Sequence, residues 1–168
     1  MKESEYKHIR SGDIVLVENY PNPQFKEAKS PPAKDRFAVV IGCFREGFVS
    51  LPCQAIVTKG GKTERNDYFL RENEIRVPEG ILDSQKDITI RGVIKGHRFP
   101  LINKEQMIFK AGTLPLETKL ELVQLHERIL KIPRQVKEME KENPNYIKFI
   151  NYFKEVTLAE KLQFMYDA

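Results

Sequence analysis

The chain has 168 residues, a length that suits one domain with a well-formed core, and it is 40% hydrophobic and 31% charged. No apolar run reaches the length of a membrane span and residues 1–10 are too polar for a signal peptide, so we expect a cytoplasmic protein with no membrane segment. The net charge of +4 lies in residues 1–132, because basic and acidic side chains balance in residues 133–168. This distribution favours a polyanionic partner for the first part of the chain.

Two short apolar runs near the start of the chain predict paired β-strands. Residues 14–17 (IVLV) and 37–41 (FAVVI) are rich in β-branched side chains and are bounded by Gly or Pro. The segment between them, residues 18–36, contains four prolines, which indicates a long surface loop. Loops of this length in a compact domain are usually functional or disordered. The loop brings Arg36 to the start of the second strand.

Six further runs predict strands. Each is short, several contain Gly, and turn signals separate them, as is typical of a small and strongly curved β-barrel. The predicted strands are residues 48–57, 67–70, 74–77, 88–94, 99–102 and 107–110. Two cysteines, Cys43 and Cys53, fall in strand-like runs. Because disulfides are rare in the cytoplasm and no Cys/His spacing suggests zinc, we expect two buried thiols and neither a metal nor another cofactor.

A helix is predicted between two prolines, Pro115 in its first turn and Pro133 just after its end. One apolar face should meet the core. Its members are Leu116, Leu120, Val123 and Leu130, with Leu122, Leu125 and Ile129 beside them.

Residues 133–168 predict a separate helical appendage. Tyr146, Ile150 and Phe153 recur at helical spacing, and residues 157–160 (TLAE) predict a capping box before a last short helix over residues 158–166. The aromatic face needs a burial site. It could pack on its own domain, cross to a second chain, or cover a binding groove and so regulate it.

Several motifs occur in an order that resembles the MazF/PemK (Kid) family of ribonuclease toxins. They are Gly12-Asp13-Ile14 at the first strand, Arg36 before the AVVI strand with Phe37 in place of the usual proline, residues 92–102 (GVIKGHRFPLI), and residues 110–114 (KAGTL) before a helix. The resemblance covers roughly residues 10 to 132. It implies a β-rich α+β fold, a small SH3-like curved β-barrel with a packed helix over residues 1–132, and leaves residues 133–168 as a helical C-terminal extension.

The resemblance also implies an activity. Members of the family are metal-independent endoribonucleases that cut single-stranded RNA, including mRNA. The ribose 2′-hydroxyl attacks the adjacent phosphate, which leaves a cyclic phosphate and a 5′-hydroxyl. The family works as a homodimer that an antitoxin protein neutralises, so the resemblance implies both partners here.

Four residues are candidates for catalysis. Metal-free RNA cleavage needs an acid, a base and cationic groups around the phosphate. By the resemblance, Arg36 stands at the family's phosphate-stabilising arginine and Lys95 where some members have a catalytic arginine. His97 stands at a functional aspartate, and its titration near neutrality suits proton transfer. On residues alone, Arg36 could equally be a surface ion-pair partner and His97 an ordinary loop histidine.

The fourth candidate is Thr58. Family members carry a catalytic hydroxyl after a Pro-Cys or Pro-Val pair, whereas this chain has Gln54 and Ala55 at the ungapped positions. Thr58 supplies the hydroxyl only if the strand is bulged or gapped there.

The long loop mixes basic side chains with the aromatic Tyr20 and Phe25 and could line an RNA groove, because single strands are held by phosphate contacts together with stacking. The basic candidates for RNA binding are Lys26, Lys29 and Lys34 in the loop and Arg98 in residues 92–102. The alternative for this basic loop is a solvated surface without a partner.

A second function class is a non-catalytic module on the same barrel that binds nucleic acid or a protein, the catalytic hydroxyl having been lost. Geometry discriminates between the two classes. Convergence of Arg36, Lys95 and His97 near Thr58 favours the enzyme, whereas an Arg36 tied to a carboxylate far from His97 favours the binding module.

Overall fold

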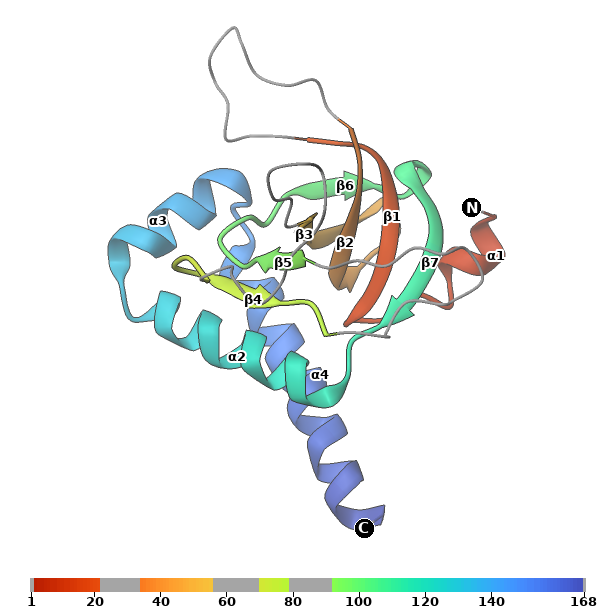
Figure 1. The fold of residues 1–168 in the computed structure, drawn as a ribbon. Coiled ribbons are helices and arrows are strands. Elements are labelled where there is room, and N and C mark those ends of the chain that lie inside the picture. Colours follow the sequence, from red (N-terminus) through yellow and green to blue (C-terminus); the bar gives the residue numbers. More distant parts are fainter. Residues whose placement is uncertain (1, 22–33, 56–69, 79–91, 168) are drawn as a thin grey trace, which may run out of the picture.

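The computed structural model describes residues 2–21, 34–55, 70–78 and 92–167 (Figure 1). A curved sheet forms the body, and three C-terminal helices cover one side of it. The elements in chain order are α1 (Glu3–Tyr6), β1 (Asp13–Tyr20), β2 (Lys34–Cys43), β3 (Gly47–Ala55), β4 (Glu74–Arg76), β5 (Gly92–Lys95), β6 (Leu101–Asn103), η2 (Lys104–Gln106), β7 (Met107–Thr113), α2 (Leu116–Leu130), α3 (Pro133–Glu142) and α4 (Tyr146–Asp167).

The sheet has seven antiparallel strands in the order β4-β5-β3-β2-β1-β7, with β6 paired to the first part of β3. The fold is therefore of the β-rich α+β kind. The predicted closed barrel is wrong for the described part of the chain, because no ladder there joins β7 to β4 or β6. The strands β4 and β6 have only three residues each, so they offer few backbone groups to a further ladder.

The central strands are buried on both faces, which explains their continuous apolar runs. Since side chains alternate along a strand, Val39 and Ile41 of β2 point into a core shared with α2 and α4, while Ala38 and Val40 point into a second core on the other face. Register shifts, such as the one on β2 before Gly42, add the curvature seen in Figure 1. Of the two cysteines, Cys53 is buried as predicted, whereas Cys43, at the end of β2, is exposed.

Helix α2 meets the core with a face that is rotated from the predicted one. Leu122, Leu125 and Ile129 are almost fully buried, whereas the predicted stripe is only partly buried except for Val123. Three polar residues of α2 are buried, Thr118, Lys119 and His126, and two of them have a partner on α4: Lys119 pairs with Glu160, and His126 bonds to Tyr146. Packing against α4 thus sets the rotation of α2. The pattern of hydrophobic residues along α2 alone does not predict this rotation.

Helix α4 is continuous from Tyr146 to Asp167, so the capping box and the short last helix predicted at Thr157 are wrong. Residues 146–167 contain neither Pro nor Gly, and nothing in the sequence breaks the helix. Thr157 is fully buried inside it.

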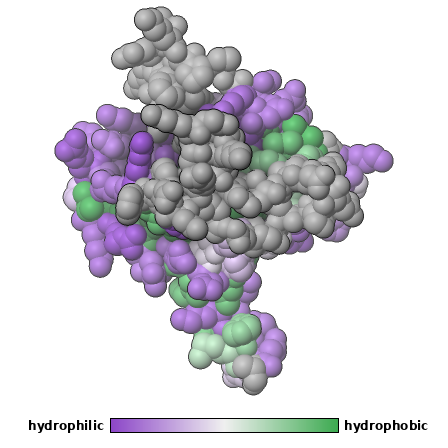
Figure 2. Space-filling model, viewed as in Figure 1, coloured by the Kyte–Doolittle hydropathy of each residue, from purple (hydrophilic) through white to green (hydrophobic). Residues whose placement is uncertain are grey.

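The extension shares the main core through Met139, Tyr146, Ile150 and Phe153. The end of α4 leaves the body (Figure 1), and its apolar side chains lie on the surface at the tip that Figure 2 shows in green. Phe164 is 67% exposed and Tyr166 is 88% exposed. None of the helices in the described ranges has the length and apolar character needed to cross a bilayer.

Candidate functional site

A buried pair of hydroxyls lies where β1 ends and β2 begins. Tyr20, the last residue of β1, pairs with Lys34 across the β1–β2 ladder. Its ring is 1% exposed, and its hydroxyl lies 3.0 Å from Oγ of Ser50 on β3, in a hydrogen bond that either group can donate. The bond links β1 to β3 across β2, where Ser50 pairs with Val40, and Arg36 stands two residues along β2 from Lys34.

Charged groups from three elements affect the Tyr20 hydroxyl electrostatically. Burial raises the pKa of Tyr20 well above its usual value, the hydrogen bond from Ser50 lowers it, the charge of Glu142 raises it, and that of Arg36 lowers it. Burial lowers the pKa of the Arg98 guanidinium, while Glu142 and Tyr20 oppose that shift. The Tyr20 hydroxyl therefore interacts electrostatically with three charged groups, which are Arg36 of β2, Arg98 of the segment after β5, and Glu142 of α3.

Glu142 comes from the extension. It is the last residue of α3, and its Oε2 accepts a hydrogen bond of 2.8 Å from the backbone N–H of Phe99. Its Oε1 is buried without a hydrogen-bond partner in the part of the chain that the structure describes. Burial raises the pKa of this carboxyl, whereas the Phe99 bond and the charge of Arg98 lower it. The site thus contains a desolvated carboxylate with one oxygen available.

Phe99 anchors that contact. Its ring packs edge-on against Tyr146 with centroids 5.1 Å apart, and Tyr146 in turn bonds Nδ1 of His126 at 2.7 Å. Phe99 and Tyr146 are fully buried. The backbone N–H that holds Glu142 is therefore fixed by an aromatic cluster of the core.

Lys95 is engaged elsewhere. It lies opposite Glu74 in the β4–β5 ladder and forms an ion pair with that carboxylate. The side chain of Glu74 is 0% exposed and that of Lys95 is 12% exposed, and Oε1 of Glu74 accepts a 2.8 Å hydrogen bond from the backbone N–H of Arg71. This cation is thus committed to a buried carboxylate.

His97 lies in the turn after β5. The turn is tight because the N–H of Gly96 donates to the carbonyl of Asn73 at 2.8 Å, and a Cβ at position 96 would lie 2.7 Å from a methyl carbon of Leu125. Burial lowers the pKa of His97 below 6.5, and the charges of Arg98 and Lys95 lower it further, against the opposing effects of Glu74 and Glu138. Its Nδ1 is buried with no hydrogen-bond partner among the described residues. The ring is therefore neutral at pH 7 and able to accept a proton.

The predicted site residues divide into three groups. Arg36 and Arg98 both have an electrostatic effect on Tyr20. His97 directly precedes Arg98 in the chain. Lys95 lies two residues before His97, but it is paired with Glu74. Lys34 is exposed at the start of β2. Thr58, Lys26 and Lys29 lie outside the described residues.

Two residues of the site, Ser50 and Glu142, were not identified from the sequence. They had no usable signal, since their roles depend on contacts across 30 and 43 residues of chain. Tyr20 was predicted only as an aromatic side chain of the long loop, whereas the structure buries it at the end of β1.

Comparison with known proteins adds no family to this description. No family model matches the chain, and no curated protein matches it. Within the described ranges, no group of three or more His, Cys, Asp or Glu is arranged to hold a metal ion. The resemblance to the MazF/PemK family therefore rests on the sequence motifs, and the site has to be interpreted from its own geometry.

Proposed function

We propose that this protein is a MazF/PemK-like endoribonuclease that cleaves single-stranded RNA without a metal. The observation that carries the proposal is that Arg36 and Arg98 both act electrostatically on the buried Tyr20 hydroxyl, which is hydrogen-bonded to Ser50. Guanidinium groups hold phosphate oxygens with two parallel bonds, and they do so most strongly where water is excluded. Two arginines that act on one buried group suit a phosphodiester.

In the proposed reaction, the ribose 2′-oxygen bonds to phosphorus while the bond from phosphorus to the 5′-oxygen breaks. Arg36 and Arg98 stabilise the charge that develops on the phosphate oxygens. His97, neutral at pH 7, accepts the proton of the 2′-hydroxyl. The departing 5′-oxygen takes a proton from water and His97 returns its proton to solvent, so the products are a cyclic phosphate and a 5′-hydroxyl.

The remaining groups support these three. The charge of Glu142 favours the charged form of Arg98, and Lys95 neutralises Glu74 beside His97. Thr58 stays in the proposal as an assisting hydroxyl, with Lys26, Lys29 and Lys34 as contacts to the RNA backbone. By the resemblance, the protein acts in the cytoplasm as a homodimeric toxin that an antitoxin protein neutralises.

Incubation of the purified chain with a 5′-labelled single-stranded RNA in the presence of EDTA tests the proposal. We expect cleavage at a small set of sites, with cyclic phosphate on one product and a 5′-hydroxyl on the other. Cleavage that requires a divalent metal, or products with a 5′-phosphate, would contradict it.

The alternative is an RNA-binding module without catalysis. One observation favours it: Lys95 is paired with Glu74, and Arg98 has Glu142 beside it, so two of the predicted cations already face carboxylates. Retention of RNA by the intact chain with no cleavage of any substrate in a random-sequence pool would select this alternative.

A further inference from the structure

A cleft of about 460 Å³ lies at the opposite end of β2 from Arg36. Its walls come from α1, from the turn between β2 and β3, from η2 and from α4. Cys43, at its edge, is seven residues along β2 from Arg36, which corresponds to about 23 Å. The cleft is therefore separate from the site described above, and the function proposed there does not use it.

Three aromatic rings form part of the wall, and the fold holds each of them. The hydroxyl of Tyr6 contacts the carbonyl oxygens of Gly47 at 2.5 Å and Phe44 at 2.9 Å, so α1 is tied to the β2–β3 turn. Phe44 stacks on Phe149 of α4 with centroids 5.8 Å apart. Tyr152 of α4 packs over the backbone of β2 and remains 50% exposed. A flat ligand can stack here without rearranging the wall.

Cationic side chains surround these rings. Among the residues that the structure describes, the lining contains four of them, Lys7, Arg10, Arg45 and Lys104, against one carboxylate, Glu3. That carboxylate is 3.2 Å from Nζ of Lys104. The cleft therefore keeps an excess of positive charge after its one ion pair is counted.

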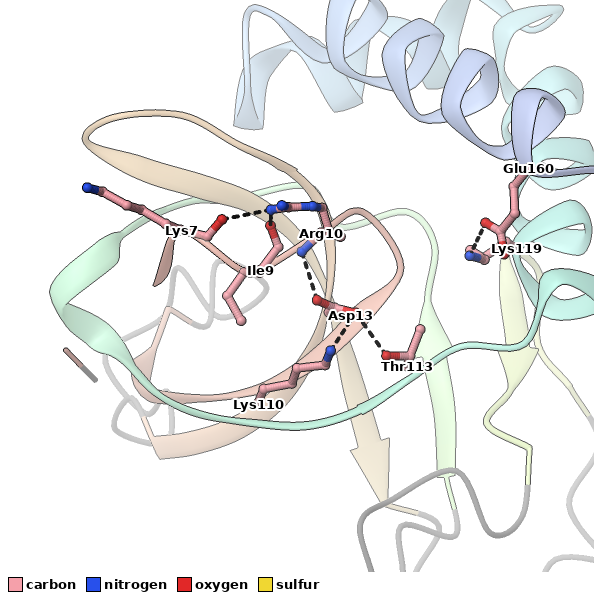
Figure 3. A network of polar contacts seen from close by, with 8 residues as sticks. All are labelled: Lys7, Ile9, Arg10, Asp13, Lys110, Thr113, Lys119 and Glu160. Carbon is pink, nitrogen blue, oxygen red and sulfur yellow. Dashed lines mark hydrogen bonds and ion pairs between the residues drawn. The ribbon is translucent and has the colours of Figure 1, made fainter. Parts of the chain in front are cut away.

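Arg10 is pre-oriented by the backbone. Its Nη1 donates to the carbonyl oxygens of Lys7 at 2.7 Å and Ile9 at 3.1 Å, as Figure 3 shows. The nearby carboxylate of Asp13 does not cancel its charge, because Asp13 accepts from the Arg10 backbone N–H and from the Thr113 hydroxyl, and lies 3.4 Å from Nζ of Lys110. Because this guanidinium is already held in one orientation, binding an anion costs little further side-chain entropy.

We propose that this cleft binds a nucleoside phosphate, with the base stacked on the aromatic wall and the phosphate held by Arg10 and its cationic neighbours. Rings interleaved with cations are the arrangement that holds nucleotides by stacking and charge. The volume lies in the range of small-ligand sites. Such a ligand can be a free nucleotide or one residue of a single strand, since both offer the same base and phosphate.

The test measures binding to the full-length chain by calorimetry, with AMP, adenosine and inorganic phosphate as separate probes. Because the cleft uses both halves of the ligand, AMP should bind at least tenfold more tightly than adenosine or phosphate. A 2′-O-methyl pentaadenylate, which cannot be cleaved by 2′-hydroxyl attack, identifies the source: tighter binding than AMP indicates a strand, and equal binding indicates a free nucleotide. No binding of AMP, or AMP binding no tighter than phosphate, would overturn the inference.

Two variants locate the site. Tyr152→Ala removes a half-exposed ring and Arg45→Gln removes an exposed charge, and each should weaken AMP binding about tenfold. Tyr166→Ala and Arg128→Gln, at exposed positions away from the cleft, are the matched controls and should bind like the parent. If Tyr152→Ala has a lower melting temperature than the parent, the location of the site is tested by AMP binding to Arg45→Gln alone.

Arg36→Ala separates this inference from the proposed ribonuclease. AMP binding should survive that substitution even when RNA cleavage is lost. Loss of AMP binding in Arg36→Ala, or its persistence in both cleft variants, would place the ligand elsewhere and overturn the inference.

Discussion

The two ends of β2 gather cations in different ways. Around Arg36, the charged groups lie beside buried partners: Glu142 is held by a backbone N–H and Glu74 by Lys95 and Arg71. Around Cys43, the cations lie at the surface around aromatic rings, and the one ion pair there, between Lys104 and Glu3, is exposed. The first arrangement is desolvated and fixed, as chemistry on a charged substrate requires, and the second is open, as binding and release require.

The largest expected effect concerns the ion pairs at the two ends. Lys95→Met leaves Glu74 charged and buried without its partner, so we expect a loss of about 3 kcal/mol in the free energy of unfolding. Lys104→Met, at the open end, should cost less than about 1 kcal/mol because water screens Glu3. Urea denaturation measures both. Equal losses would remove the distinction between a buried and an open end.

The next prediction concerns His97. Its pKa is lowered, so the ring is the free base over most of the physiological range, and the cleavage rate should rise with pH to a plateau, with the midpoint of the rise below the usual pKa of a histidine. His97→Ala should lower the plateau on the order of 100-fold and abolish the acidic limb. The check is a pH–rate profile under single-turnover conditions, with His8→Ala as the matched control. A profile that keeps its acidic limb in His97→Ala would assign the proton transfer to another group.

A third prediction concerns the aromatic cluster that supports the buried end. Burial lowers the pKa of His126 from 6.5 to about 3. Below pH 6.5 the unfolded chain binds a proton that the folded chain does not, so stability falls as the pH falls, by about 1.4 kcal/mol per unit. Between pH 7 and pH 5 the loss should be about 2 kcal/mol.

Urea denaturation at the two pH values measures this loss, and His126→Gln isolates it. Because Gln does not titrate, this variant should lose less stability than the parent between pH 7 and pH 5, whatever its stability at pH 7. His8→Gln, with an exposed side chain, is the control for the substitution. The same pH dependence in His126→Gln and the parent would refute the assignment to His126.

Part of this arrangement could be predicted from the sequence. Apolar runs bounded by turn residues predicted β1, β2 and β3, and the two prolines predicted α2. Closure of the sheet could not be judged, because it depends on how far the short strands β4 and β6 extend. The contact between Glu142 and Phe99 spans 43 residues and joins the extension to a turn, and no local pattern in either segment encodes it.

The smallest expected effect concerns Glu142. Burial raises its pKa, so the charged form is disfavoured in the folded state, and removing the charge should not reduce stability above the pKa of an ordinary carboxyl. Glu142→Gln keeps an acceptor for the Phe99 N–H and should be as stable as the parent at pH 7.5, or more stable by up to about 1 kcal/mol. RNA cleavage should nevertheless fall about tenfold, since Arg98 loses the nearby negative charge that favours its charged form.

The control for Glu142 is Glu3→Gln at the open end, which should change neither stability nor cleavage. A marked loss of stability in Glu142→Gln together with full cleavage would make the carboxylate structural. The site would then consist of the arginines and His97 without it.

Cleavage of a single-stranded RNA by Arg36→Ala tests the central claim most directly. The rate constant is compared with that of the parent and of Arg128→Ala, whose substitution removes an exposed arginine from α2. The account predicts a loss of about 100-fold or more in Arg36→Ala, with an unchanged melting temperature and full activity in the control. Parental cleavage by a folded Arg36→Ala would contradict the assignment of the active site to this end of β2.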